Sequence, residues 1–88
     1  MADQTTLEPW LRDILVKQSC REPGEVTPAA RLVEDLGLDS LDQIEIQMAI
    51  ETARRVTMED GVIFDAVTVA DLIALVDRTI RAGEVPHG

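Results

Sequence analysis

The sequence predicts an all-α fold, a small bundle of three main helices with a long first connection and a short extra helix. Three segments repeat apolar residues at helical spacing, and no stretch of useful length alternates with the two-residue period of a strand. With 88 residues, of which 45% are apolar, the chain has room for one domain and a modest core. We expect a single domain over residues 1–88, with its core over about residues 5–82 and a flexible tail over residues 83–88.

The first helix is expected over about residues 7–19, where apolar residues recur at helical spacing. These residues are Leu7, Leu11, Ile14 and Leu15. Thr5 or Thr6 can cap its N-terminus, and Pro9 suits its first turn. Two prolines and a glycine over residues 20–28 then predict a loop. The later part of this loop is apolar, so we expect it to pack across the helices.

The second helix is expected over about residues 40–54, after Gly37 breaks the chain, with Asp39 or Ser40 as its N-cap. Its predicted core stripe is Ile46, Ala49, Ile50 and Ala53. Residues 57–66 are expected to form a short helix or a turn.

A capping-box variant, Thr68-Val69-Ala70-Asp71, predicts the start of the last helix, and Gly83 and Pro86 end it. Its predicted buried stripe is Val69, Leu72, Ile73, Val76 and Ile80.

The charge of the chain limits its partners. Seventeen acidic residues against eight basic ones give a net charge of −9, which repels nucleic acid and anionic membrane surfaces. A basic protein is the natural complement. No apolar run approaches the roughly 20 residues of a membrane span, and the polar start does not resemble a signal peptide. We therefore expect a cytoplasmic monomer.

The residues that usually carry catalysis are nearly missing. His87, the only histidine, lies in the terminal tail, where nothing positions a base. Cys20 has no second cysteine to pair with and no activating cluster around it, so a structural or partly exposed thiol is expected. The acidic residues between 34 and 42 lack the spacing of a calcium loop, and no other metal-ligand set is present. We expect no catalytic residue and no metal site.

Ser40 allows two interpretations, because it stands where a loop meets a helix. The first is an ordinary N-cap. The second is a modification site, because the unpaired N–H groups and the positive dipole end of a helix favour a phosphate esterified to the hydroxyl. A hydrolase nucleophile of the Gly-Asp-Ser-Leu type is excluded, because no positioned histidine activates the hydroxyl.

The helix after Ser40 carries a second signal. Between Leu32 and Ala53 there are six acidic residues and no lysine or arginine, whereas a solvated helix face normally mixes signs. A second apolar stripe accompanies the acids and consists of Leu41, Ile44 and Met48. This combination predicts a docking face for a basic partner. The alternative is that Leu41 and Met48 merely broaden the core face.

These residues resemble the acyl carrier proteins. The resemblance depends on Leu-Val-Glu-Asp-Leu-Gly-Leu-Asp-Ser-Leu-Asp at residues 32–42, on the acidic helix that follows, and on the chain length. It implies a four-helix bundle of the acyl-carrier-protein type, in which Ser40 carries 4′-phosphopantetheine from coenzyme A. It also implies partners: a phosphopantetheinyl transferase, a loading ligase, and downstream transferases or synthases with basic docking patches. The residues implied to bind them are Asp39, Leu41, Asp42, Ile44, Glu45, Met48 and Glu51.

The function implied is a carrier that holds acyl or aminoacyl thioesters and has no catalysis of its own. The residues implied to line its cargo cavity are Gln43, Ile46, Gln47, Ile50, Arg54, Met58 and Ile63. Arg54 stands where the family usually has an aromatic residue, and Phe64 turned inward is one replacement for it. Two amides and a guanidinium suit a long alkyl chain poorly, which favours a short or polar cargo. The alternatives are a housekeeping carrier of fatty-acid synthesis and an unmodified interaction module of the same fold.

Overall fold

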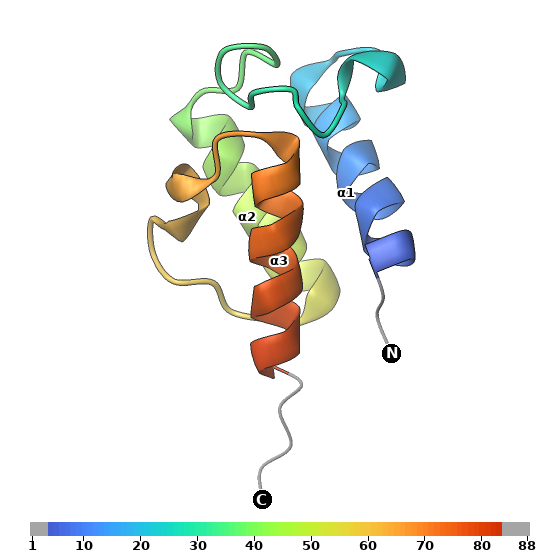
Figure 1. Ribbon diagram of the computed structural model, residues 1–88. Helices are drawn as coiled ribbons and strands as arrows, with labels where there is room; N and C mark the ends of the chain where they lie inside the picture. The colour runs from blue at the N-terminus through green and yellow to red at the C-terminus, as the bar shows by residue number, and fades with distance from the viewer. Residues whose placement is uncertain (1–3, 84–88) are drawn as a thin grey trace, which may run out of the picture.

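The computed structural model describes residues 4–83, and side chains over residues 7–82, so residues 84–88 of the expected tail, with Pro86 and His87, lie outside the described part. The fold is all-α, as the sequence predicts (Figure 1). Its elements are α1 (Gln4–Ser19), η1 (Pro23–Glu25), α2 (Ser40–Arg54), η2 (Val62–Asp65) and α3 (Val69–Gly83). Within residues 4–83, no helix is long and apolar enough to cross a membrane.

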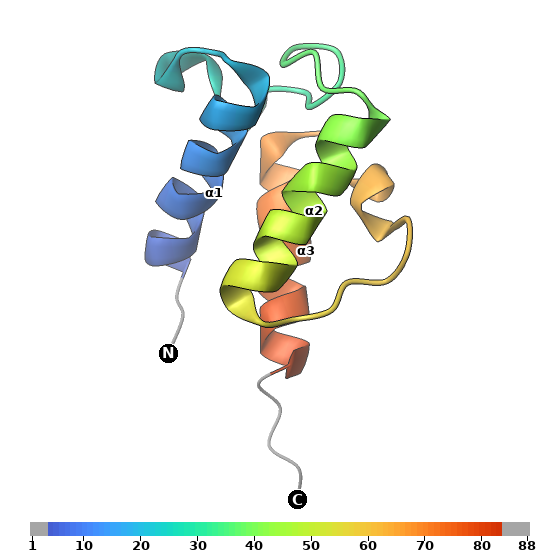
Figure 2. The same cartoon turned by 180° about the vertical axis from the view of Figure 1, so that it is seen from behind.

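Helix α1 runs in the direction opposite to α2 and α3, which both run from the end of the first loop toward the other end of the molecule (Figures 1 and 2). The connection from α2 to α3 must therefore travel back along the bundle, and it carries the short 3-10 helix η2, which packs on α2. Helix α1 packs on both α2 and α3. This arrangement places the start of α2 and the start of α3 at the same end of the molecule.

Helix α1 begins earlier than expected, at Gln4, so the prediction that Thr5 or Thr6 caps it is wrong. Pro9 then lies in the second turn rather than the first, where its missing N–H leaves one helical hydrogen bond unmade. The polar residues before Leu7 have no apolar periodicity, which is why the sequence pattern did not mark this start. The bounds of α2, by contrast, are those predicted.

The core is aliphatic and takes residues from all three helices and from the first loop. The predicted stripe of α3 is buried throughout, and so are Ile46 and Ile50 of α2. Ala49 and Ala53 are exposed, so their assignment to the core is wrong. The long first loop packs across the bundle as expected, and its buried residues are Val26, Ala30, Leu32, Leu36 and Leu38. Phe64 is 46% exposed and does not turn inward to replace the missing aromatic residue.

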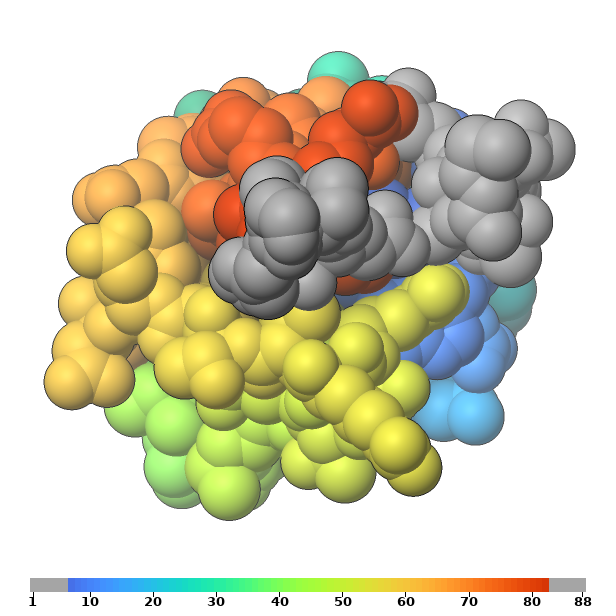
Figure 3. Space-filling view, turned by 90° about the horizontal axis from the view of Figure 1, so that it is seen from below, coloured from blue at the N-terminus to red at the C-terminus, as the bar shows by residue number. Residues whose placement is uncertain are grey.

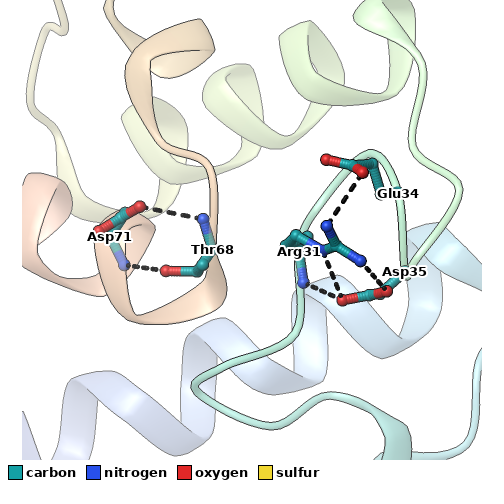
Figure 4. A network of polar contacts seen from close by, with 5 residues as sticks. All are labelled: Arg31, Glu34, Asp35, Thr68 and Asp71. Carbon is teal, nitrogen blue, oxygen red and sulfur yellow. Dashed lines mark hydrogen bonds and ion pairs between the residues drawn. The ribbon is translucent and has the colours of Figure 1, made fainter.

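The start of α3 is held by the predicted capping box. The Thr68 hydroxyl accepts a hydrogen bond from the backbone N–H of Asp71 at 3.1 Å, and the Asp71 carboxylate accepts one from the N–H of Thr68, also at 3.1 Å (Figure 4). The first loop joins this end through an antiparallel bridge between Arg31 and Thr68. The loop that precedes α2 is therefore fixed against the loop that precedes α3.

Candidate functional site

The N-terminus of α2 is capped by Asp39. Its carboxylate accepts a hydrogen bond from the N–H of Asp42 at 2.8 Å, and the Asp42 carboxylate accepts one from the N–H of Asp39 at 3.0 Å. Ser40 is therefore the first residue of the helix and not its cap, and it is exposed. Among residues 4–83, none forms a hydrogen bond with its hydroxyl. The N-cap interpretation of Ser40 is wrong, because the neighbouring aspartate already fills that position.

The surroundings of Ser40 fit a phosphate ester. The first N–H groups of a helix lack intrahelical partners, and the helix dipole adds a partial positive charge at the same end. Gly37, with φ of 71°, turns the chain into the helix in a left-handed conformation that favours glycine. The loop thus leads into α2 so that the hydroxyl at its first position faces solvent.

Asp42 stays ionised near neutral pH. The hydrogen bond from the Asp39 N–H, and then the one from the Gln18 amide, hold the pKa of its carboxyl below the usual value. The pKa of the Asp42 carboxyl is therefore lower in the folded state than in the unfolded state, where it is about 3.9. The ionised carboxylate stabilises the fold at pH values above about 3.9, and this contribution is lost as the pH falls through the folded-state pKa. The negative charge beside Ser40 is therefore present under physiological conditions.

Gln18 of α1 belongs to this site, although the sequence did not mark it. Its amide N–H₂ donates to Asp42 Oδ1 at 3.0 Å and to Glu45 Oε1 at 2.7 Å. One neutral side chain thus holds two carboxylates of α2 side by side and ties the end of α1 to the start of α2. A single glutamine near a helix end carries no pattern, so only the packing of the two helices identifies it.

The outer face of α2 is apolar and acidic. Leu41 is 61% exposed, Met48 is 59% exposed and Ile44 is also exposed, so the alternative that they broaden the core is wrong. Glu45 lies beside them and is exposed. We call Leu41, Ile44, Glu45 and Met48, with Asp42 at their edge, the α2 outer face. Its role in docking stays a prediction.

Glu51 does not share the environment of Asp42 and Glu45. Its carboxylate accepts a hydrogen bond from the backbone N–H of Met58 at 2.8 Å and one from the Gln47 amide at 3.4 Å. Glu51 is half-buried and ties the loop after α2 back onto the helix. This contact gives Glu51 a structural role that the sequence pattern had not suggested.

A network of ion pairs in the first loop lies near the same end of the molecule (Figure 4). The Arg31 guanidinium contacts Glu34 at 3.0 Å and Asp35 at 3.3 Å, and the Arg31 backbone N–H donates to Asp35 at 2.8 Å. This backbone hydrogen bond, followed by the one from the guanidinium, holds the pKa of the Asp35 carboxyl below its usual value. Arg31 therefore neutralises the charge of two acidic residues of the loop. No basic residue lies between the acidic residues of α2.

The residues expected to line one cargo cavity are divided among several places. Ile46, Ile50 and Ile63 are buried in the core. Gln43 lines a groove near Ser40, whereas Met58 lines a hollow of about 540 Å³ between the loop after α2 and α3. That hollow lies at the other end of α2, about 21 Å of helix away from Ser40. Figure 3 shows this end, where the loop after α2 meets the last turns of α3.

The position of Arg54 also differs from the expectation. Its guanidinium lies over the Trp10 ring of α1, 4.2 Å from the ring centroid. Arg54 thus packs against α1 and does not join Gln43 in the groove. Cys20 is exposed, and within the described part of the chain no group of three or more His, Cys, Asp or Glu side chains is placed to hold a metal ion.

A small helical bundle with an accessible serine hydroxyl at a helix start, beside an acidic and apolar helix face, has the features of a carrier domain. The chain matches the family model described as "Phosphopantetheine attachment site" over residues 9–76. It is 36% identical over 78 residues to an acyl carrier protein of Akkermansia muciniphila, covering 89% of this chain and 96% of that protein. It is 32% identical over 68 residues to acyl carrier proteins of Campylobacter curvus and Campylobacter concisus, covering 77% of this chain and 88% of each.

The chain therefore belongs to the acyl carrier protein family. Its cofactor is 4′-phosphopantetheine, and proteins of this family carry acyl groups and act together with partner enzymes.

Proposed function

We propose that Ser40 is the attachment point of 4′-phosphopantetheine and that the protein carries acyl or aminoacyl groups as thioesters. The observation that supports Ser40 most directly is its exposed hydroxyl, left without a hydrogen bond among residues 4–83 because Asp39 caps the helix. The attached group supplies the thiol on which the thioester forms, so the chain needs no reactive cysteine or histidine of its own. Tethering raises the effective concentration of the cargo at each partner enzyme.

In this proposal, the α2 outer face binds the partner enzymes. Asp39 and Leu41 flank the attachment serine and meet the phosphopantetheinyl transferase, while Glu45 and Met48 contact basic and apolar groups of loading ligases, transferases and synthases. Gln18 supports the face by holding Asp42 and Glu45 together. A cytoplasmic location is part of the same proposal.

The test of attachment is mass spectrometry after incubation with coenzyme A and a broad-specificity phosphopantetheinyl transferase. We expect one phosphopantetheine unit per chain, located on the peptide that contains Ser40. No mass gain with several such transferases would overturn the proposal and favour the unmodified interaction module.

For the cargo, we propose a short or polar group rather than a long alkyl chain. Gln43 supports this, because it lies three residues after Ser40 on α2 and lines a groove, where an alkyl chain would desolvate its amide without offering a hydrogen bond. The alternative is the ordinary carriage of growing fatty acids. The two cargo hypotheses differ in the free energy that a longer acyl chain gains by contact with the protein.

We expect the melting temperature of the loaded protein to rise little along the series acetyl, hexanoyl and decanoyl thioester. A bound chain stabilises only the folded state, and an exposed chain gains far less than the roughly 0.8 kcal/mol of each buried methylene. Differential scanning calorimetry of the three loaded forms, against the form with a free thiol, measures this. A steady climb in melting temperature with chain length would restore fatty-acid carriage.

We expect Glu45→Lys to lower kcat/KM of the transferase for this protein roughly tenfold and to weaken its dependence on salt. The lysine replaces attraction by repulsion on the α2 outer face, while an exposed charge contributes little to folding. Asp60→Lys is the matched control, because it changes the net charge equally from an exposed position in the loop after α2. Equal losses of kcat/KM for both variants would show that the transferase responds to the net charge of the protein and does not dock on the α2 outer face.

A further inference from the structure

Two arginines of this acidic chain have no partner within the part that the structure describes. All eight basic residues lie within residues 7–82, and six of them contact other groups of the chain: Arg12, Lys17, Arg21, Arg31, Arg54 and Arg81. Over the same residues, no group forms a hydrogen bond or an ion pair with the guanidinium of Arg55 or Arg78. Because the chain has seventeen acidic residues, two unpaired arginines are unexpected, and they mark a candidate binding site for an anion.

Arg55 and Arg78 come from different elements and line the same hollow of about 540 Å³. Arg55 directly follows α2, and Arg78 lies in the second half of α3, at the end of the molecule that Figure 3 shows. Val56 and Val62, both half-buried, also line the hollow. The hollow therefore combines two cationic groups with apolar walls.

The backbone of Arg55 is unusual for an arginine. The residue ends α2 with φ of 55°, in the left-handed region that favours glycine. Its guanidinium makes no contact within residues 7–82 that would offset this strain. Local stability therefore does not explain an arginine at this position, which favours a role of its side chain in binding.

The charge around the hollow is opposite to that of the whole chain. Its lining includes the two arginines and a single acidic residue, Glu59. Arg78 also borders a second hollow near Asp65 and Asp71 but forms an ion pair with neither. The acidic residues around Ser40 lie about 21 Å of helix away, whereas the Debye length is about 8 Å at physiological ionic strength. Their charge is therefore screened at the hollow, and the two arginines favour an anion there.

The exposure of the two arginines limits the kind of anion. Both side chains are exposed, and a single exposed ion pair contributes little to binding. A ligand therefore needs two carboxylates, one for each guanidinium, and an apolar group that contacts the walls at Val56 and Val62. A protein segment with two acidic residues and an apolar residue offers all three together.

We infer that this hollow docks an acidic segment of a partner protein, whose carboxylates pair with Arg55 and Arg78. The interaction has the opposite polarity to that proposed for the α2 outer face, where the carrier supplies the acids. The two surfaces lie at different ends of α2, so a protein bound at the hollow leaves Ser40 and the α2 outer face open to enzymes. This inference does not depend on the attachment at Ser40.

The test is a nuclear magnetic resonance titration of the full unmodified chain with synthetic octapeptides. Each peptide carries two glutamates and one leucine, and the set varies the spacing of the glutamates from one to four residues. We expect at least one peptide to bind tenfold more tightly at low salt than its counterpart with glutamine in place of glutamate. The largest shifts should fall on the backbone signals of residues 55–59 and 75–79.

Arg55→Gln and Arg78→Gln should each weaken binding of that peptide at least fivefold. Lys17→Gln is the matched control, because it removes one positive charge from an exposed position on α1, and it should change the affinity less than twofold. Circular dichroism checks that the variants fold. If one does not, the position of the shifts in the wild type decides.

Three outcomes would overturn the inference: no peptide that binds more tightly than its glutamine counterpart, equal losses in all three variants, or glutarate binding as tightly as the peptides. The last would assign the hollow to a small dicarboxylate. Shifts at the hollow that grow with protein concentration without peptide would assign it to a second copy of this chain and overturn the inference as well. A missing mass gain on Ser40 would overturn only the proposed function, so the two failures are distinguishable.

Discussion

Ser40→Ala is expected to abolish phosphopantetheinylation completely while leaving the stability of the fold within about 0.5 kcal/mol of the wild type. The modification needs the hydroxyl, and no other residue at the start of α2 offers one. The fold does not need it, because Asp39 caps the helix and no described residue bonds to the Ser40 side chain. Mass spectrometry after transferase treatment and urea denaturation of the same variant measure the two effects.

Asp39→Ala is the contrasting variant, because it removes the cap and keeps the hydroxyl. We expect it to lower the free energy of unfolding by about 1 kcal/mol and still to accept the prosthetic group, although more slowly. Asp39→Asn should keep most of the stability, because asparagine caps a helix nearly as well as aspartate. This variant therefore distinguishes the effect of the negative charge from the effect of the capping hydrogen bond. A Ser40→Ala protein that loses as much stability as Asp39→Ala would show that the serine is the cap after all.

Ile50→Ala is expected to lower the free energy of unfolding by about 2–5 kcal/mol, a large part of the stability of a domain this small. Ile50 has no exposed surface, so its removal costs both the transfer free energy and a cavity. The melting temperature should fall by about 4–8 °C for each kcal/mol lost.

Met48→Ala, on the same helix, is the matched variant from the exposed side. Its side chain is 59% exposed, so the free energy of unfolding should change by no more than about 0.5 kcal/mol, while binding to a partner enzyme weakens through lost apolar contact. Parallel denaturation curves of the two variants measure this. Equal stability of Ile50→Ala and the wild type would mean that the two stripes of α2 are assigned the wrong way round.

Local patterns in the sequence determined much of the fold. The periodicity of α3 predicted its buried stripe, and Gly37 with the capping candidates Asp39 and Ser40 predicted the start of α2. Both signals are local, because a helix face repeats within one segment and a cap involves residues three apart. Ser40 became the candidate attachment residue through a local signal as well, because the Asp-Ser-Leu motif coincides with the start of α2.

The start of α1 and the core residues of α2 were predicted less well. Thr5 and Thr6 lie within α1, and Ala49 and Ala53 face solvent. A helix start without a clear cap has little sequence signal, and alanine is nearly as suitable for a helix surface as for its core. Which side of α2 is covered depends on where α1 and η2 pack, and helical spacing alone does not contain that information.

Only the tertiary structure decided the partners of the polar side chains. Gln18 bonds to two carboxylates of α2 across the interface between helices, Glu51 bonds to the loop after α2, and Arg54 lies over Trp10. Gln43 came to line a groove because the first loop and the segment before α3 meet beside it. These contacts join residues from 7 to 44 positions apart, and their energies depend on distance and burial, which a linear pattern does not encode.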